Sequence, residues 1–141
     1  MISFFQRWLE MHPIHPMIVH FPIALTGAAF LFILLAAWRK NPLLEYAAYV
    51  NTALAAVSTI FAGATGIYDN YLNYEGQAPN ANWKIALAIA LFLLTTLTAF
   101  ARYKRPDLFS TFKGLYIALC GLNFAIALVL AFLGGVILYG F

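Results

Sequence analysis

The three histidines of the chain, His12, His15 and His20, lie in one short stretch that opens the first long apolar segment. Neutral imidazole is the commonest protein ligand for transition metals, so this clustering indicates a metal or haem site. Asp69 follows the second apolar segment, and the topology argued below places it on the same side of the membrane as the histidines. Its carboxylate could therefore bind the metal or orient a histidine that does. We therefore predict His15 and His20 as cofactor ligands, and all three histidines with Asp69 as the metal-binding set.

The same residues also allow a structural interpretation without a cofactor. His20 would then hydrogen-bond backbone carbonyls freed near Pro22, or pair with Asp69. The histidine spacing matches no standard metal motif, and the other apolar segments contain no histidine, so a haem would need its second axial ligand from a methionine or another chain. Met11 and Met17 flank the histidines, and thioether sulfur with imidazole suits copper. Haem b and copper are the two candidate cofactors.

Three prolines shape this stretch of backbone. Pro13 and Pro16 disfavour helix at the preceding residues, so we expect residues 12–15 to be non-helical and Pro16 to lie in the first helical turn. Pro22 falls inside the apolar segment and predicts a kink or a new helix start. Irregular backbone at membrane depth occurs where protein or water covers it, so we expect His20 to point into the mouth of a bundle.

The composition is that of an integral membrane protein. Hydrophobic residues make up 64% of the 141 residues and charged residues only 9%, against about 25% charged residues in soluble domains. The small net charge of +3 forms no basic stripe, which excludes a nucleic-acid partner. We expect the bilayer as the main partner and one domain over residues 1–141.

Four apolar runs are each long enough to cross a bilayer, which takes roughly 20 residues. They predict an all-α, integral membrane four-helix bundle, preceded by a short amphipathic interfacial helix over residues 2–11. The spans carry no charge that we expect to be buried, and no nucleophile–base pair or phosphate loop occurs, so we expect neither a transporter nor an enzyme. The predicted spans are residues 17–38, 43–68, 83–101 and 114–139.

Small and polar residues inside the spans predict contacts between helices. Ala62 and Gly66 lie four residues apart on one helix face, which allows another helix to approach closely. Amide and hydroxyl side chains within the spans are expected to hydrogen-bond across helices. These side chains are Asn51, Ser58, Thr59 and Asn123.

The distribution of lysine and arginine predicts the orientation. Six basic residues flank the two loops that would share one side, against two on the other side. The positive-inside rule then places both termini and the histidines outside the cytoplasm, in the periplasm of a bacterial inner membrane. The six are Arg39, Lys40, Arg102, Lys104, Arg105 and Lys113, and the two are Arg7 and Lys84.

Three motifs resemble those of the DUF2231 family of small bacterial four-span membrane proteins. The run from His15 to Leu25, His-Pro-Met-Ile-Val-His-Phe-Pro-Ile-Ala-Leu, resembles the opening signature of that family. Ala64–Asp69 is similar to its small-residue, glycine and aspartate turn after the second span. Gly134–Gly140 is similar to its closing Gly-Gly segment, so the resemblance extends over the whole chain.

This resemblance implies a four-span bundle with paired histidines and an aspartate on one outer rim, and an association with c-type cytochromes or other redox partners. Several members carry further histidines before the third span and near the C-terminus, where this chain has Asn80, Asn82 and Trp83 and ends at Phe141. We expect a small membrane subunit of a redox or respiratory-type complex, with a metal or haem at its outer rim. The alternative is a structural or anchoring subunit with no cofactor.

Overall fold

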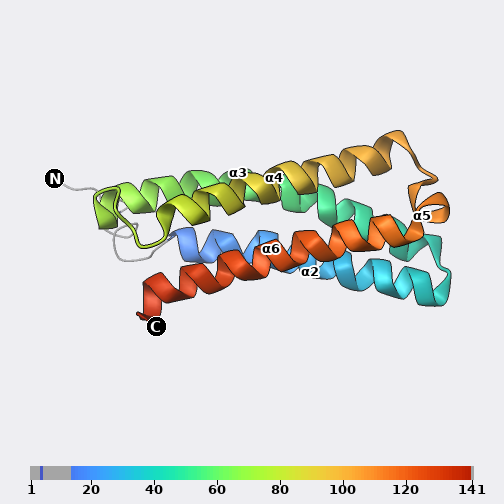
Figure 1. The fold of residues 1–141 in the computed structure, drawn as a ribbon, viewed down its shortest axis with the longest axis horizontal. Helices are drawn as coiled ribbons and strands as arrows, with labels where there is room; N and C mark the ends of the chain where they lie inside the picture. Colours follow the sequence, from blue (N-terminus) through green and yellow to red (C-terminus); the bar gives the residue numbers. More distant parts are fainter. Residues whose placement is uncertain (1–3, 5–13, 141) are drawn as a thin grey trace.

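The computed structural model describes residues 4 and 14–140, and all regular structure in this part of the chain is helical (Figure 1). This confirms the all-α prediction. Four long helices are apolar enough to cross a membrane, and one short helix lies between the last two. The amphipathic helix expected over residues 2–11 falls outside the described residues, apart from Phe4. The helices are α2 (Ile14–Arg39), α3 (Pro42–Tyr74), α4 (Ala81–Lys104), α5 (Leu108–Thr111) and α6 (Lys113–Tyr139).

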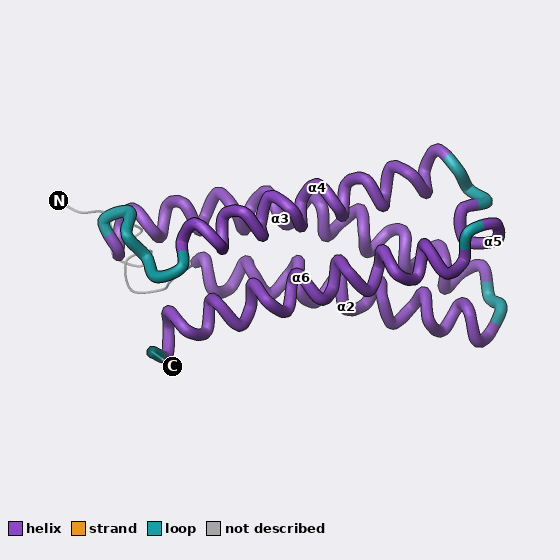
Figure 2. Tube along the Cα trace, viewed as in Figure 1, coloured by secondary structure: helices purple, strands orange, loops and turns teal. Residues whose placement is uncertain are grey.

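The long helices run up and down beside one another and are joined by short loops (Figure 2). Helix α2 packs against α3 and α6, and α4 packs against the same two helices. One end holds the start of α2, the loop after α3 and the end of α6, and we call it the histidine end (Figure 1). The other holds the α2–α3 turn, α5 and the start of α6, and we call it the basic end. This arrangement confirms the predicted four-helix bundle.

The outer faces of the long helices are apolar. Large side chains there are about half exposed on every long helix, among them Leu31 of α2, Ile60 of α3, Leu97 of α4 and Phe132 of α6. A soluble monomer rarely exposes such continuous apolar surface. A hydrocarbon environment around the bundle removes this conflict, as expected for a membrane protein.

The buried face of each helix is a seam of small and hydroxylated residues spaced three and four apart. Such spacing keeps one stripe of a helix directed at its neighbours, and small side chains let membrane helices approach closely. On α3 the seam is Glu45, Ala48, Thr52, Ala55, Thr59 and Ala62; on α4 it is Leu91, Thr95 and Thr98; on α6 it is Tyr116, Cys120, Asn123 and Ala127.

Within the described part of the chain, only one of the four side chains expected to bond across helices does so. Asn123 Nδ2 of α6 donates to Thr98 Oγ1 of α4 over 3.3 Å. Asn51, Ser58 and Thr59 instead donate to carbonyls three or four residues earlier on α3. Short polar side chains reach these carbonyls of their own helix without requiring a partner, which is why the interhelical prediction was wrong for them.

The prolines interrupt α2 less than predicted. The helix begins at Ile14 and continues through Pro22, so the prediction of non-helical backbone was wrong for residues 14 and 15. The first turn of a helix has no intrahelical partners for its N–H groups, so Pro16 removes no hydrogen bond there. Pro22 is buried, and its carbonyl accepts a 2.7 Å hydrogen bond from the hydroxyl of Thr26.

Candidate functional site

His15 is fixed between α2 and α3 at the histidine end. Its ring is half-buried, and its Nδ1 lies 3.1 Å from Oγ1 of Thr65 on α3. The Thr65 hydroxyl donates its own proton to the carbonyl of Phe61, 2.9 Å away, or to that of Ala62. Oγ1 therefore accepts from His15, so Nδ1 carries the proton and Nε2 keeps a free lone pair in the neutral ring.

Gly66 provides the space that the His15 ring occupies. A β-carbon built on Gly66 would lie 2.8 Å from His15 Cε1 and 3.3 Å from Nε2. Carbon atoms that are not bonded normally stay about 3.5 Å or more apart, so a larger residue at position 66 would displace the ring. Ala62, one turn earlier, is buried. The predicted small-residue face of Ala62 and Gly66 is confirmed, and it receives the imidazole of His15.

His20 lies on a different face of α2 and is exposed. Its Nδ1 contacts the carbonyl oxygen of Pro16; since a carbonyl only accepts, Nδ1 carries the proton here too. The expectation that His20 points into the bundle was wrong. The buried stripe of α2 begins at Pro22, two residues on, and two residues are about 200° apart around a helix.

Asp69 and Lys84 complete the polar surroundings of His15. Asp69, one turn beyond Thr65, accepts a 2.6 Å hydrogen bond from Nδ2 of Asn73. Lys84, near the start of α4, interacts electrostatically with both Asp69 and His15. The only hydrogen bond from His20 within the described chain is to Pro16, so the proposed pairing of His20 with Asp69 is absent there.

The predicted metal ligands do not converge on one point within the described chain. His15 and His20 are five residues apart, which places them about 140° apart around α2. No three histidine, cysteine or acidic side chains among residues 4 and 14–140 are placed to hold one ion. Of the charges that act on His15, that of Lys84 opposes a bound cation and that of Asp69 favours one. His12 and Met11 lie outside the described residues.

A second polar cluster, at the basic end, was missed by the sequence interpretation. Glu45 of α3 is only 6% exposed, so the expectation of no buried charge in the spans was wrong. Two nitrogens of Arg102 on α4 donate to the two carboxylate oxygens of Glu45. Nε donates to Oε1, and the terminal nitrogen Nη2 donates to Oε2 over 2.8 Å. The Tyr49 ring lies 5.4 Å from the guanidinium carbon. Two parallel hydrogen bonds of this kind are strong and directional, so the pair joins α3 to α4.

The spacing of the buried seams could have revealed this pair. Glu45 lies three residues before Ala48, and Arg102 lies four residues after Thr98, so both belong to the buried stripes of their helices. Tyr116 of α6 is fully buried nearby in the core of the basic end, and its hydroxyl has no hydrogen-bond partner among the described residues.

Comparison with known proteins places the chain in a family. The family model of "Predicted membrane protein (DUF2231)" matches residues 11–141. The chain belongs to the DUF2231 family. No curated protein and no solved structure matches the chain. The resemblance inferred from the three motifs is therefore confirmed.

The fold explains why two of the DUF2231-like motifs belong together. The opening motif contributes His15, and the motif after the second span contributes Thr65 and Gly66, which contact that histidine. The closing motif forms the last turn of α6 and ends at Gly140, whose φ of 70° terminates the helix. The first two motifs thus supply the residues on the two sides of a single contact between α2 and α3.

Proposed function

We propose that this DUF2231 protein is a non-catalytic accessory subunit of a redox or respiratory-type membrane complex, and that His20 at its histidine end contacts a partner. The observation that carries the proposal is the state of the His20 ring. The side chain is exposed, and its Nδ1 is already engaged by the Pro16 carbonyl. Ligating histidines are typically oriented in this way, with the remaining nitrogen directed outward.

A metal or haem at this rim requires ligands from beyond the described residues. No three described histidine, cysteine or acidic side chains are placed to hold one ion, and His15 and His20 lie on different faces of α2, so we propose that copper or haem b would be held between His20 and a second chain, or with His12. His15 would support such a site indirectly because its contact with Thr65 and Gly66 fixes the start of α2. Asp69 would act through the charge it places beside His15.

The alternative is a structural or anchoring subunit without any cofactor. The contact between His15 and Gly66 favours it, since this imidazole fills a space between helices. In that case the histidine end would dock a partner by packing and hydrogen bonding alone. His20→Ala would then weaken assembly and would remove no chromophore.

The charge distribution supports an orientation for the protein in the membrane. The basic end carries six of the eight lysines and arginines, and cytoplasmic loops are enriched in these residues. We propose a bacterial inner membrane location with the basic end in the cytoplasm, both termini in the periplasm and a periplasmic partner such as a c-type cytochrome. A reporter that works only in the periplasm should then be active when it is fused to the C-terminus, and one that works only in the cytoplasm should be inactive. Activity of the cytoplasmic reporter would contradict this orientation.

The cofactor question is decided by spectra of protein extracted gently from its native membrane. Absorbance and elemental analysis are compared for wild type, His20→Ala and the control Tyr71→Ala, which changes another exposed residue near the end of α3. The redox proposal expects a haem band or about one copper per chain in wild type and Tyr71→Ala, and its loss in folded His20→Ala. Wild type without either group supports the anchoring alternative.

A further inference from the structure

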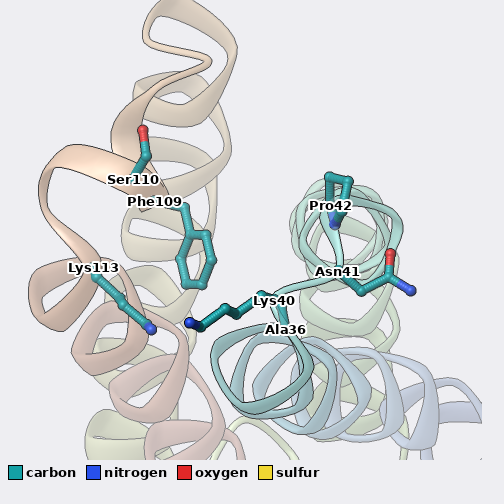
Figure 3. A pocket seen from close by; sticks show the side chains of 7 residues that line it. All are labelled: Ala36, Lys40, Asn41, Pro42, Phe109, Ser110 and Lys113. Carbon is teal, nitrogen blue, oxygen red and sulfur yellow. The ribbon is translucent and has the colours of Figure 1, made fainter.

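A pocket of about 370 Å³ opens at the basic end, between the α2–α3 turn and the segment that joins α5 to α6 (Figure 3). Its apolar wall comes from Ala36, Pro42 and Phe109. Lys40 approaches from one side and Lys113 from the other, and their ammonium groups point toward one another in Figure 3. The remaining lining residues are Asn41 and Ser110.

No described residue balances the positive charge of this pocket. None of the seven described residues that line it is acidic, and neither lysine forms a salt bridge within the described chain. Lys113 Nζ has two weak partners, the Ala37 carbonyl at 3.4 Å and the ring of Phe109, whose centroid lies 5.7 Å away. An anion that lies between the two ammonium groups would be attracted by both.

Asp107, the acidic residue of the loop before α5, is already engaged elsewhere. Asp107 accepts a 2.9 Å hydrogen bond from the Thr111 hydroxyl and a 3.3 Å hydrogen bond from Arg105. These bonds, that of Thr111 above all, lower the pKa of Asp107, so its charge is committed to its own loop. The Ser110 hydroxyl donates to the Asp107 carbonyl. The side chain of Asn41 is directed away from the two lysines in Figure 3, so the two ammonium groups are the charged donors of the pocket.

The backbone at Lys40 is unusual for a lysine. Lys40 follows the last residue of α2 with a φ of 53°, the left-handed region. Glycine is the usual residue after a helix end in this conformation because it has no β-carbon. The backbone at this position would therefore accommodate glycine, but the chain has a long cationic side chain there.

We propose that this pocket binds a phosphate group, and that in the membrane it is the phosphate of an anionic phospholipid. Basic pockets between helices at the membrane boundary recognise such headgroups. Trp38, two residues before Lys40 near the end of α2, is exposed, and tryptophan is enriched at the level of the membrane where headgroups lie. The phosphate would lie between Lys40 and Lys113, and the apolar wall would face the glycerol and upper acyl chain. This site is at the opposite end from His20 and does not depend on the proposed function.

The test measures thermal unfolding of the full-length protein in an uncharged detergent. Phosphatidylglycerol, phosphatidylcholine and inorganic phosphate are titrated in turn, since a ligand that binds the folded state raises the unfolding midpoint. The variants are Lys40→Gly, which fits the left-handed backbone, and Lys113→Gln, which keeps the first two methylenes of the stem and removes the charge. Lys104→Gln removes an exposed charge of the same end from outside the pocket.

We expect phosphatidylglycerol to stabilise wild type and Lys104→Gln, and phosphatidylcholine to do so at least tenfold less effectively. Lys40→Gly and Lys113→Gln should each weaken the apparent affinity for phosphatidylglycerol at least fivefold, while Lys40→Gly without lipid unfolds no earlier than wild type. Equal stabilisation by inorganic phosphate would overturn the assignment to lipid and keep the phosphate site. No selective effect of phosphatidylglycerol, or an effect unchanged in both pocket variants, would overturn the proposal.

Discussion

The imidazole ring of His15 occupies the space that a side chain at position 66 would need. Residue 66 is a glycine, so the ring can pack against it. A β-carbon on Gly66 would come within 2.8 Å of the ring. Thr65 holds the same ring by its hydroxyl. A histidine that suggested a metal ligand in the sequence is thus also a packing element between α2 and α3, with one nitrogen committed to that contact.

Gly66→Ala should destabilise the bundle by displacing His15. Overpacking of this kind costs roughly 1–3 kcal/mol. Gly63→Ala is the matched control, since it lies on the same helix with nothing within 4 Å of the added carbon. Alanine there should leave stability unchanged or raise it by up to about 1 kcal/mol. The measurement is unfolding in mixed micelles with increasing denaturing detergent, and equal effects of the two substitutions would contradict the contact.

Loss of either partner of the Glu45–Arg102 pair should be more damaging than loss of both. Glu45→Gln or Arg102→Met leaves one charge without its partner in a mostly buried position, and such changes cost roughly 3 kcal/mol or more. The double variant should recover a large part of this loss. A double-mutant cycle on the free energy of unfolding checks it, and purely additive effects would show that the two side chains are not coupled.

Tyr116→Phe should be neutral or stabilising. The ring is fully buried, and its hydroxyl has no partner among the described residues. Removal of an unsatisfied buried hydroxyl should stabilise by about 1 kcal/mol, whereas Tyr116→Ala should cost roughly 3 kcal/mol or more through the cavity that it leaves. The same unfolding assay applies, and a clear destabilisation by Tyr116→Phe would indicate a hydrogen bond from this hydroxyl.

Cys120 should be unreactive until the bundle opens. It is 1% exposed on the buried seam of α6, and thiol reagents require access to the sulfur. Maleimide should label the natively solubilised protein at least a hundredfold more slowly than protein unfolded in denaturing detergent. Rapid labelling under native conditions would mean that α6 does not pack as described, because no other cysteine can account for the signal.

The sequence was sufficient for the number of long helices, although it did not predict the short helix α5, and it was insufficient for the rotation of each long helix about its axis. Apolar run length determines how many helices form, so the four spans were predictable. The contact between His15 and Gly66 depends on how α2 and α3 face one another, which the pattern of α2 alone does not specify. His20 was misplaced because a kink or a new helix start at Pro22 was expected to make the backbone near it irregular, whereas α2 continues through Pro22 and keeps a single buried stripe.

The buried ion pair was missed for a different reason. Glu45 and Arg102 lie at the ends of their spans, where charges normally face the membrane interface. Only their register with the buried seams of α3 and α4 distinguishes them from interfacial residues. Reading that register from Ala48 and Thr98 outward would have predicted that both side chains point inward and meet.

The most direct test of the central claim is native mass spectrometry of the protein released gently from its own membrane. The claim is that the exposed His20 joins this subunit to a redox partner. Wild type should then appear in a complex heavier than one chain by the mass of a different subunit, with any haem or metal retained, and His20→Ala should lose most of that complex while remaining folded. A wild-type protein found only as free chains, or a His20→Ala complex as abundant as that of wild type, would contradict the claim.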